Sequence, residues 1–174
     1  MHAFALRLLA SLALLACIGI SPRTTDTFAY LQVPGVTGPV VSTGFTGDIE
    51  LLSSNLQYVG VGGITVLKPS PLTFTKNVDT TSPVFQKAFL SGQPFTGDTM
   101  LGFYARDPRT GKMSPIEQVK FHNVVVTSDS TGVSIESISL TYDAIDACVT
   151  PASKGGPPDC AAWDFTKHTP TYPK

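Results

Sequence analysis

Apolar and polar residues alternate with a period of two along much of this chain, which is the pattern of half-buried β-strands. The alternation is clear in the stretch Leu-Thr-Phe-Thr-Lys, which puts Leu72 and Phe74 on one face and two threonines on the other. Comparable segments predict strands over residues 27–33, 47–52, 64–67, 72–76, 99–106, 117–127 and 133–142. The pattern therefore predicts a mainly β protein.

One helix is predicted, over residues 82–91. Ser82 suits the N-cap because its hydroxyl can accept a hydrogen bond from a first-turn N–H, and Pro83 lacks an N–H that would be unpaired there. Gly92 suits the left-handed residue that ends a helix. Phe85 and the apolar residues three and four positions later share one face. A helix this short is marginal alone in water, so we expect it to pack on a sheet.

The last apolar strand changes parity part of the way along. Val133 and Ile135 alternate out of phase with Ile138, Leu140 and Tyr142, so we expect a bulge or bend between the two groups. A bend of this kind curls a sheet toward closure. Strands joined by short turns, with one helix among them, predict an antiparallel β-barrel or two-sheet sandwich with one flanking helix.

The N-terminus differs in kind from the rest. An uninterrupted apolar run follows Arg7 and extends to about Ile20, which is the length of a signal-peptide core and shorter than a membrane-spanning helix. We interpret residues 1–21 as a secretory signal and residues 22–174 as a single domain. An alternative is a lipoprotein signal, in which Cys17 would be acylated and become the first residue.

Two cysteines remain after the predicted signal, Cys148 and Cys160, in a Cys-, Pro- and Gly-rich C-terminal tail over residues 146–174. In an oxidising compartment, a disulfide closing a loop of this size stabilises a protein by roughly 3 kcal/mol. The alternative is a pair of free thiols in a reducing compartment. Because the signal predicts export, we expect the disulfide.

Composition and motifs indicate no chemistry. The chain has 14% charged residues and a formal net charge of -1, which is unlike a nucleic-acid-binding surface. The Gly60–Gly63 stretch lacks the lysine and the spacing of a nucleotide-binding loop. His122, on a predicted strand, is interpreted as a surface or satisfied residue, and neither it nor His168 has metal-ligand spacing with the cysteines. We therefore expect no enzyme, cofactor, metal or nucleic acid.

The region over residues 72–89 resembles the signature of the hemolysin-coregulated protein (Hcp) family of bacterial type VI secretion. The matching positions are Leu72, Phe74, Lys76, Val78, Asp79, Ser82 and Pro83. The segments 47–53, 121–128 and 135–142 are also similar to strands of that family, as is the Trp163-Asp164 pair in the tail. The resemblance covers roughly residues 28–165.

The resemblance implies a non-enzymatic structural protein that assembles into six-membered rings. Rings of that family stack into a hollow secretion tube, in whose lumen small effector proteins can travel. It further implies that the loops over residues 35–47 and 55–70 contact the next ring. The predicted signal adds a bacterial secreted or periplasmic location. Two other hypotheses stay open: an exported β-barrel module that binds a surface or protein ligand, and a secreted hydrolase whose site the sequence does not reveal.

Overall fold

The computed structural model describes residues 26–61, 66–151 and 156–170. The predicted signal and Cys17 lie outside these ranges. The single α-helix of the described residues, α1, spans Ser82–Ser91. The strands are β1 Thr27–Gln32, β2 Ile49–Leu51, β3 Ser53–Asn55, β4 Tyr58–Val61, β5 Val66–Pro69, β6 Leu72–Asn77, β7 Thr99–Arg106, β8 Met113–His122, β9 Val125–Thr131, β10 Ile135–Thr141, β11 Ala144–Val149, β12 Asp159–Asp164 and β13 Thr169–Pro170.

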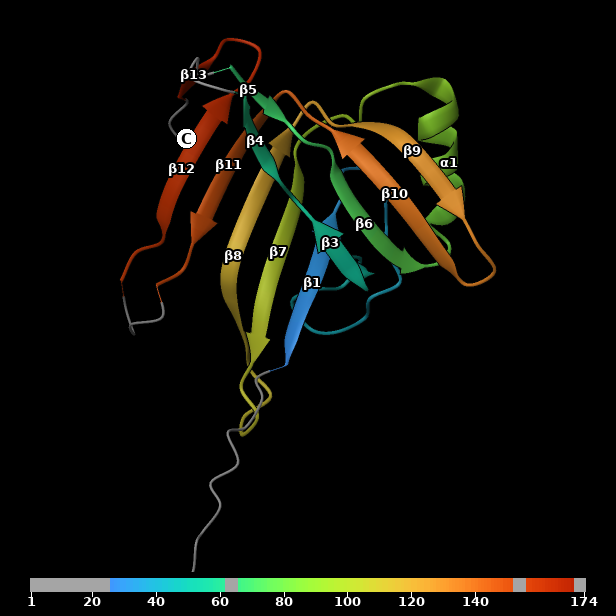
Figure 1. The fold of residues 1–174 in the computed structure, drawn as a ribbon. Coiled ribbons are helices and arrows are strands. Elements are labelled where there is room, and N and C mark those ends of the chain that lie inside the picture. The colour runs from blue at the N-terminus through green and yellow to red at the C-terminus, as the bar shows by residue number, and fades with distance from the viewer. Residues whose placement is uncertain (1–25, 62–65, 152–155, 171–174) are drawn as a thin grey trace, which may run out of the picture.

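The strands form two antiparallel sheets and a separate hairpin (Figure 1). The seven-stranded sheet has the order β13-β12-β11-β8-β7-β1-β2, and the four-stranded sheet has the order β3-β6-β10-β9. Among the strands of the described residues, β4 pairs with β5 alone. The mainly β class and the flanking helix are confirmed. Of the two predicted arrangements, the two-sheet form is present, and the described strands do not close into a barrel.

Neighbouring segments of the chain run from one sheet into the other. β8 in the larger sheet is followed directly by β9 in the smaller one, and β10 returns to β11 in the same way. Asn123 turns the first of these corners with a left-handed backbone, φ 54°. Its side-chain amide donates a hydrogen bond to Asp143, which lies at the second corner. The corners are thereby tied to each other, and together they set how the two sheets face.

Large apolar side chains from both sheets fill the space between them. Leu31, Leu101, Val119 and Phe121 come from the larger sheet, while Leu72, Phe74, Ile138 and Leu140 come from the smaller one, and all are at most 1% exposed. Period-two burial is visible along β6 and along β10. One continuous apolar core therefore joins the sheets.

The helix lies beside β9, at the outer side of the smaller sheet (Figure 1). Its anchor is Phe85, which is fully buried and makes edge-on contacts with the rings of Phe74 and Phe95. Gly92 ends the helix with φ 62°, as predicted. The predicted N-cap is wrong by one residue: Thr81 occupies the cap, and its hydroxyl donates to Asp79 and makes no cap bond. The Ser82 hydroxyl faces the interior.

The expected bend between Ile135 and Ile138 is also wrong. Inner-face burial continues without a break through Glu136, Ile138, Leu140 and Tyr142. Ile135 is 49% exposed and faces away from the core. The apparent parity change arises because a charged residue, Glu136, occupies an inner position that the sequence pattern would assign to an apolar side chain. The register shift in the pairing of β10 with β9 falls later, between Ser139 and Leu140.

Residues after the second corner extend the larger sheet, which the sequence pattern does not predict. β11 pairs with β8 on one side and with β12 on the other. Cys148 and Cys160 face each other across β11 and β12 and form a disulfide. The first strands of the predicted tail are therefore part of the sheet.

The corner at Asn123 generates the first prediction. Asn123→Ala should lower the free energy of unfolding by about 1–2 kcal/mol, because alanine adopts the left-handed region less readily than asparagine and loses the bond to Asp143. Asn123→Gly loses the same bond without the backbone cost, so it should be less destabilising. Urea unfolding of both variants measures the difference, and equal losses for alanine and glycine would contradict a backbone contribution.

Candidate functional site

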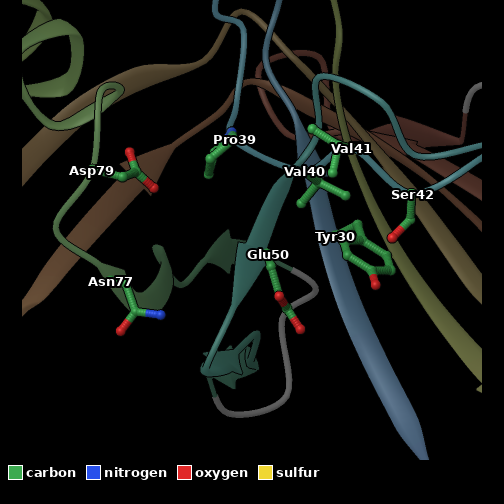
Figure 2. Close-up of a pocket in the computed structure, with 8 residues that line it drawn as sticks. All are labelled: Tyr30, Pro39, Val40, Val41, Ser42, Glu50, Asn77 and Asp79. Carbon is green, nitrogen blue, oxygen red and sulfur yellow. The ribbon is translucent and has the colours of Figure 1, made fainter.

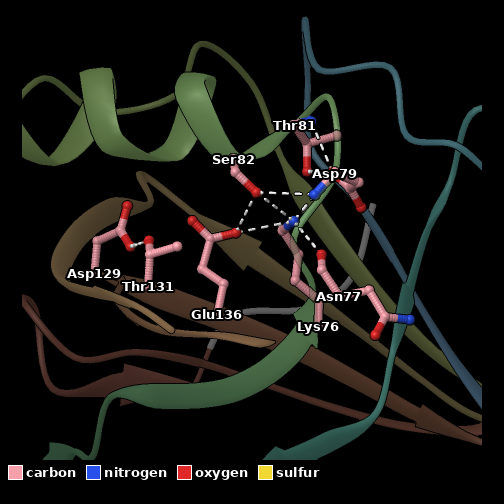
Figure 3. Close-up of polar contacts among 8 residues, drawn as sticks. All are labelled: Lys76, Asn77, Asp79, Thr81, Ser82, Asp129, Thr131 and Glu136. Carbon is pink, nitrogen blue, oxygen red and sulfur yellow. Dashed lines mark hydrogen bonds and ion pairs between the residues drawn. The ribbon is translucent and has the colours of Figure 1, made fainter. Parts of the chain in front are cut away.

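A charged pair is buried between the sheets beneath the start of the helix. Lys76 on β6 and Glu136 on β10 are direct cross-strand partners, and both side chains are 0% exposed. The Lys76 Nζ atom lies 2.9 Å from Glu136 Oε2. Each occupies an inner-face position next to apolar neighbours, Phe74 and Ile138. The two strands thus bring opposite charges together inside the core (Figure 3).

The ammonium of Lys76 has further acceptors around it. Besides Glu136, it lies within hydrogen-bonding distance of the Asn77 carbonyl at 2.9 Å, Asp79 Oδ1 at 3.0 Å and Ser82 Oγ at 3.1 Å. Three N–H groups therefore face four acceptors. A buried lysine needs such a shell, because an unpaired ammonium would be strongly disfavoured in an apolar interior.

Ser82 connects this pair to the helix. Its hydroxyl donates to Glu136 Oε2 at 2.7 Å and accepts from Lys76 Nζ and from the backbone N–H of Asp79, both at 3.1 Å. One donor and two acceptor sites are the full capacity of a hydroxyl. The first residue of α1 is therefore bonded to β6, to β10 and to the turn between β6 and the helix.

Asp79 organises that turn. Its Oδ1 atom accepts from the backbone N–H and the hydroxyl of Thr81, at 2.7 and 2.6 Å, in addition to Lys76. Burial acts to raise the pKa of Asp79, but the hydrogen bonds from Thr81 and the nearby ammonium outweigh it and hold the pKa below its usual value. Asp79 is therefore ionised in the folded protein at neutral pH.

A third carboxyl group approaches the cluster from β9. Asp129 is opposite Ile138 in the register, which places it on the same face as Glu136 of the neighbouring strand. The Asp129 Oδ2 and Glu136 Oε1 atoms are both buried, and the only interaction resolved between these two carboxyl groups is a hydrogen bond that needs a proton on one of them. Burial raises the pKa of Asp129, and the negative charge of Glu136 raises it further. The cluster of Lys76, Asp79, Glu136 and Asp129 thus holds one cation and up to three anions.

This geometry holds β6, β10 and the start of the helix together, and its lysine and glutamate are closed off from the surface. Lys76 and Glu136 have no exposed surface, and their functional atoms contact one another or the turn. Among the residues described by the structure, no group of three His, Cys, Asp or Glu side chains is arranged to hold a metal ion. The chemistry of the cluster is therefore electrostatic pairing within the fold.

A surface hollow of about 300 Å³ lies next to this cluster (Figure 2). Its lining consists of Tyr30, Pro39, Val40, Val41, Ser42, Glu50, Asn77 and Asp79. Asp79 thus reaches both the hollow and the buried lysine. The carboxylates of Glu50 and Asp79 are hydrogen-bond acceptors, so the hollow suits a cationic or donor group.

His122, at the end of β8, has two carboxylate partners, one directly before β7 and one on β11. Its Nδ1 atom lies 2.7 Å from Asp98 Oδ1, and its Nε2 atom lies 3.2 Å from Asp146 Oδ2. The ring thus lies between two carboxylate acceptors, and each ring nitrogen that carries a proton can donate to one of them. This arrangement agrees with the interpretation of His122 as a satisfied residue.

The structure separates the motif residues into three groups by burial. Leu72, Phe74, Lys76 and Ser82 are buried, Asp79 is partly buried, and Val78 and Pro83 are exposed. Reasoning from the sequence missed Glu136 and Asp129 as partners of the motif lysine. The sequence contained a pattern that could have revealed Glu136. It stands two positions before Ile138, so the two side chains lie on the same face of the strand.

The fold and the cluster together define a class: a two-sheet antiparallel β protein whose single short helix is bonded to the interior by a buried lysine–glutamate pair. A protein-family profile described as "Type VI secretion system effector, Hcp" matches residues 30–148. The chain therefore belongs to the Hcp family of type VI secretion proteins.

Solved structures show the same fold. Hcp1 from Salmonella typhimurium is similar with a TM-score of 0.71 and 19% identity, covering 83% of this chain and 99% of that chain. For the secreted protein Hcp3 from Pseudomonas aeruginosa the TM-score is 0.63, with 14% identity over 80% of this chain and 99% of that one. A type VI secretion effector from Yersinia pestis gives 0.62, with 17% identity and coverages of 78% and 98%. The comparison with curated proteins gave no match.

The raised pKa of Asp129 generates the second prediction. A folded-state pKa above the unfolded value favours folding at low pH, and this contribution is lost as the pH rises through the folded-state value. Asp129→Asn removes the buried charge, so it should raise the melting temperature at neutral pH and change it little at acid pH.

Melting temperatures of the wild type and Asp129→Asn, measured from acid to neutral pH, test this. Asp159→Asn, at an exposed strand position, is the matched control and should show no such trend. A constant difference between Asp129→Asn and the wild type at all pH values would contradict the assigned charge.

Proposed function

We propose that this protein is a non-enzymatic structural subunit of the type VI secretion tube, which assembles as a homo-hexameric ring. The observation that carries the proposal is the family match over residues 30–148. The fold supports it, because the structural likeness extends over 98–100% of the chains of several type VI secretion proteins. Stacking of such rings into a tube is part of the same proposal.

A closed ring requires two different surfaces on each subunit, since a head-to-tail interface joins unlike patches. One candidate patch is apolar and lies at the turn between β9 and β10. Val133 there is fully exposed and Ile135 is 49% exposed, next to Val78, which is 40% exposed and whose backbone N–H bonds to the Ser134 carbonyl.

A second candidate patch lies at the far end of β11. Ile116 is 40% exposed and Val149 is 48% exposed, and the neighbouring Thr150 N–H bonds to the Ile116 carbonyl. Figure 1 shows the β9–β10 turn and the β11–β12 end on opposite sides of the molecule. Two unlike apolar patches on opposite sides are the arrangement that a head-to-tail ring needs.

The buried cluster supports a structural role over a catalytic one. Its lysine and glutamate have no exposed surface, so a substrate would have to unfold the helix start to reach them. The motif residues Leu72, Phe74, Lys76, Val78, Asp79, Ser82 and Pro83 are proposed to hold α1 on the smaller sheet. In this role the motif residues fix the position of α1 for assembly.

Export of residues 22–174 after removal of residues 1–21 completes the proposal. The Cys148–Cys160 disulfide supports an oxidising location, secreted or periplasmic, since such bonds persist outside the cytosol. No helix in the part of the chain that the structure describes could cross a membrane. Acylation at Cys17 remains the alternative route to the cell surface, and small effectors in the ring lumen are the proposed cargo.

The hollow of Figure 2 favours a second candidate function. An exported binding module would use a surface recess with fixed acceptors, and the carboxylates of Glu50 and Asp79 lie in one. Its ligand would be a cationic group of a surface or protein partner. A binding module of this kind would function without forming rings.

Light scattering on residues 22–174, coupled to size-exclusion chromatography, tests the ring as the third prediction. We expect a species of about six subunits, in line with the closed symmetry of homo-oligomers. Ile135→Asp should shift it toward the monomer, because a charge cannot be buried unpaired in an apolar contact.

The control is Leu90→Asp, which places the same charge at another exposed apolar residue, 77% exposed, on α1 and outside both patches. The control should keep the ring. A strict monomer of the unmodified domain at micromolar concentration would reject the ring and favour the binding module.

A further inference from the structure

The two halves of β12 are attached to the protein in different ways. Along β12 the burial rises from the exposed residues Asp159, Cys160 and Ala161 to the buried Asp164, and Phe165 directly after it is 8% exposed. The strand pairs with β11 over its whole length. The first half of β12 therefore pairs with β11 but buries almost no apolar surface.

The second half of β12 is anchored by packing and by a turn. The Phe165 ring contacts the Tyr142 ring at 5.8 Å within the core. Asp164 Oδ1 accepts from the backbone N–H groups of Thr166 and Lys167, both at 2.9 Å. β13 then pairs back onto the same end of β12. This end is held without any contribution from the cysteines.

The first half has the disulfide in place of such an anchor. Cys160 is opposite Cys148 of β11 in the register, so the bond joins the two strands directly. Over the residues that the structure describes, β13 pairs with Trp163 and Asp164. The outer edge of residues 159–162 is therefore uncovered by any strand that the structure describes.

The cysteine pair is also open to reagents. Cys160 is exposed and Cys148 is partly exposed, on the outermost long strands of the sheet. The family match ends at Cys148, so the bond joins the last matched residue to a segment beyond the match. A dithiol of the thioredoxin class can reach such an exposed bond.

We propose that the Cys148–Cys160 bond is a redox latch that decides whether the first half of β12 covers the edge of β11. In the oxidised form the bond holds residues 159–162 on that edge. A dithiol donates two electrons and two protons to the bond, which gives two cysteine thiols while the dithiol becomes a disulfide. Residues 159–162 then detach, and Trp163, Asp164 and Phe165 stay in place.

Opening the latch changes the surface of the sheet. The last residues of β11 would present unpaired N–H and C=O groups, which an extended strand of another chain can pair with. The latch would be closed in an oxidising compartment and open in the reducing cytosol. The device is a property of the sheet edge and does not depend on the proposed ring.

Hydrogen exchange of residues 22–174 with and without a dithiol tests the latch, as the fourth prediction. We expect amides of residues 159–162, and those of β11 that face them, to exchange about tenfold faster after reduction, since local opening sets exchange at exposed edges. Exchange in Trp163–Phe165 and in α1 should stay within about twofold.

Two variants sharpen the test. The double variant Cys148→Ser and Cys160→Ser should match the reduced protein with or without dithiol. Phe165→Ala should speed exchange at Trp163 and Asp164, the end of β12 away from Cys160, in both redox forms. Unchanged exchange at residues 159–162 on reduction would overturn the latch, and so would an equal acceleration across both sheets, which would make the bond a general stabiliser.

Discussion

The structure depends on the pairing of two charges, Lys76 and Glu136, inside an apolar core. Removing both groups from water costs several kcal/mol per ion, and only close pairing with further hydrogen bonds offsets that cost. Strand pairing places the two residues directly opposite each other, so the register of β6 and β10 and the charge pair require one another. A shift of either strand by one residue would send its charged side chain to the outer face and separate the pair.

This constraint extends from the sheet to the helix. The Ser82 hydroxyl completes the shell of the pair, and Asp79 closes the turn that leads from β6 into α1. The helix is too short to be stable alone, and its side-chain contribution to the core comes chiefly from Phe85. The cluster therefore fixes the position of α1 beside β9. The position of α1 in turn shapes the surface that we assign to assembly.

Periodicity along single segments allowed much of the fold to be predicted. The alternation in residues 99–106 gives β7 with the observed bounds, and the punctuation by Pro83 and Gly92 gives the helix. These signals are local, because each depends on neighbouring residues of one strand or helix. The closing of a barrel depends on pairing between distant strands, which periodicity does not contain, and here the sheets remain two.

The candidate site was less predictable for a related reason. Lys76 was noticed through its motif, but the interior position of Glu136 contradicts the rule that charges face water. That one residue produced the false parity change in β10. β11 and β12 were missed because alanine and cysteine give little contrast between their faces, as in the segment Ala144–Val149. In both cases the neighbouring strand decides the structure, and the pattern within a single segment does not reveal that neighbour.

A double-mutant cycle on Lys76 and Glu136 measures the central interaction most directly. Lys76→Met and Glu136→Leu should each lower the free energy of unfolding by about 3–5 kcal/mol, because each leaves a buried charge without its main partner. The double variant should lose clearly less than the sum, since neither charge is then stranded. Losses that simply add would contradict the account, because the two side chains would then be independent of each other.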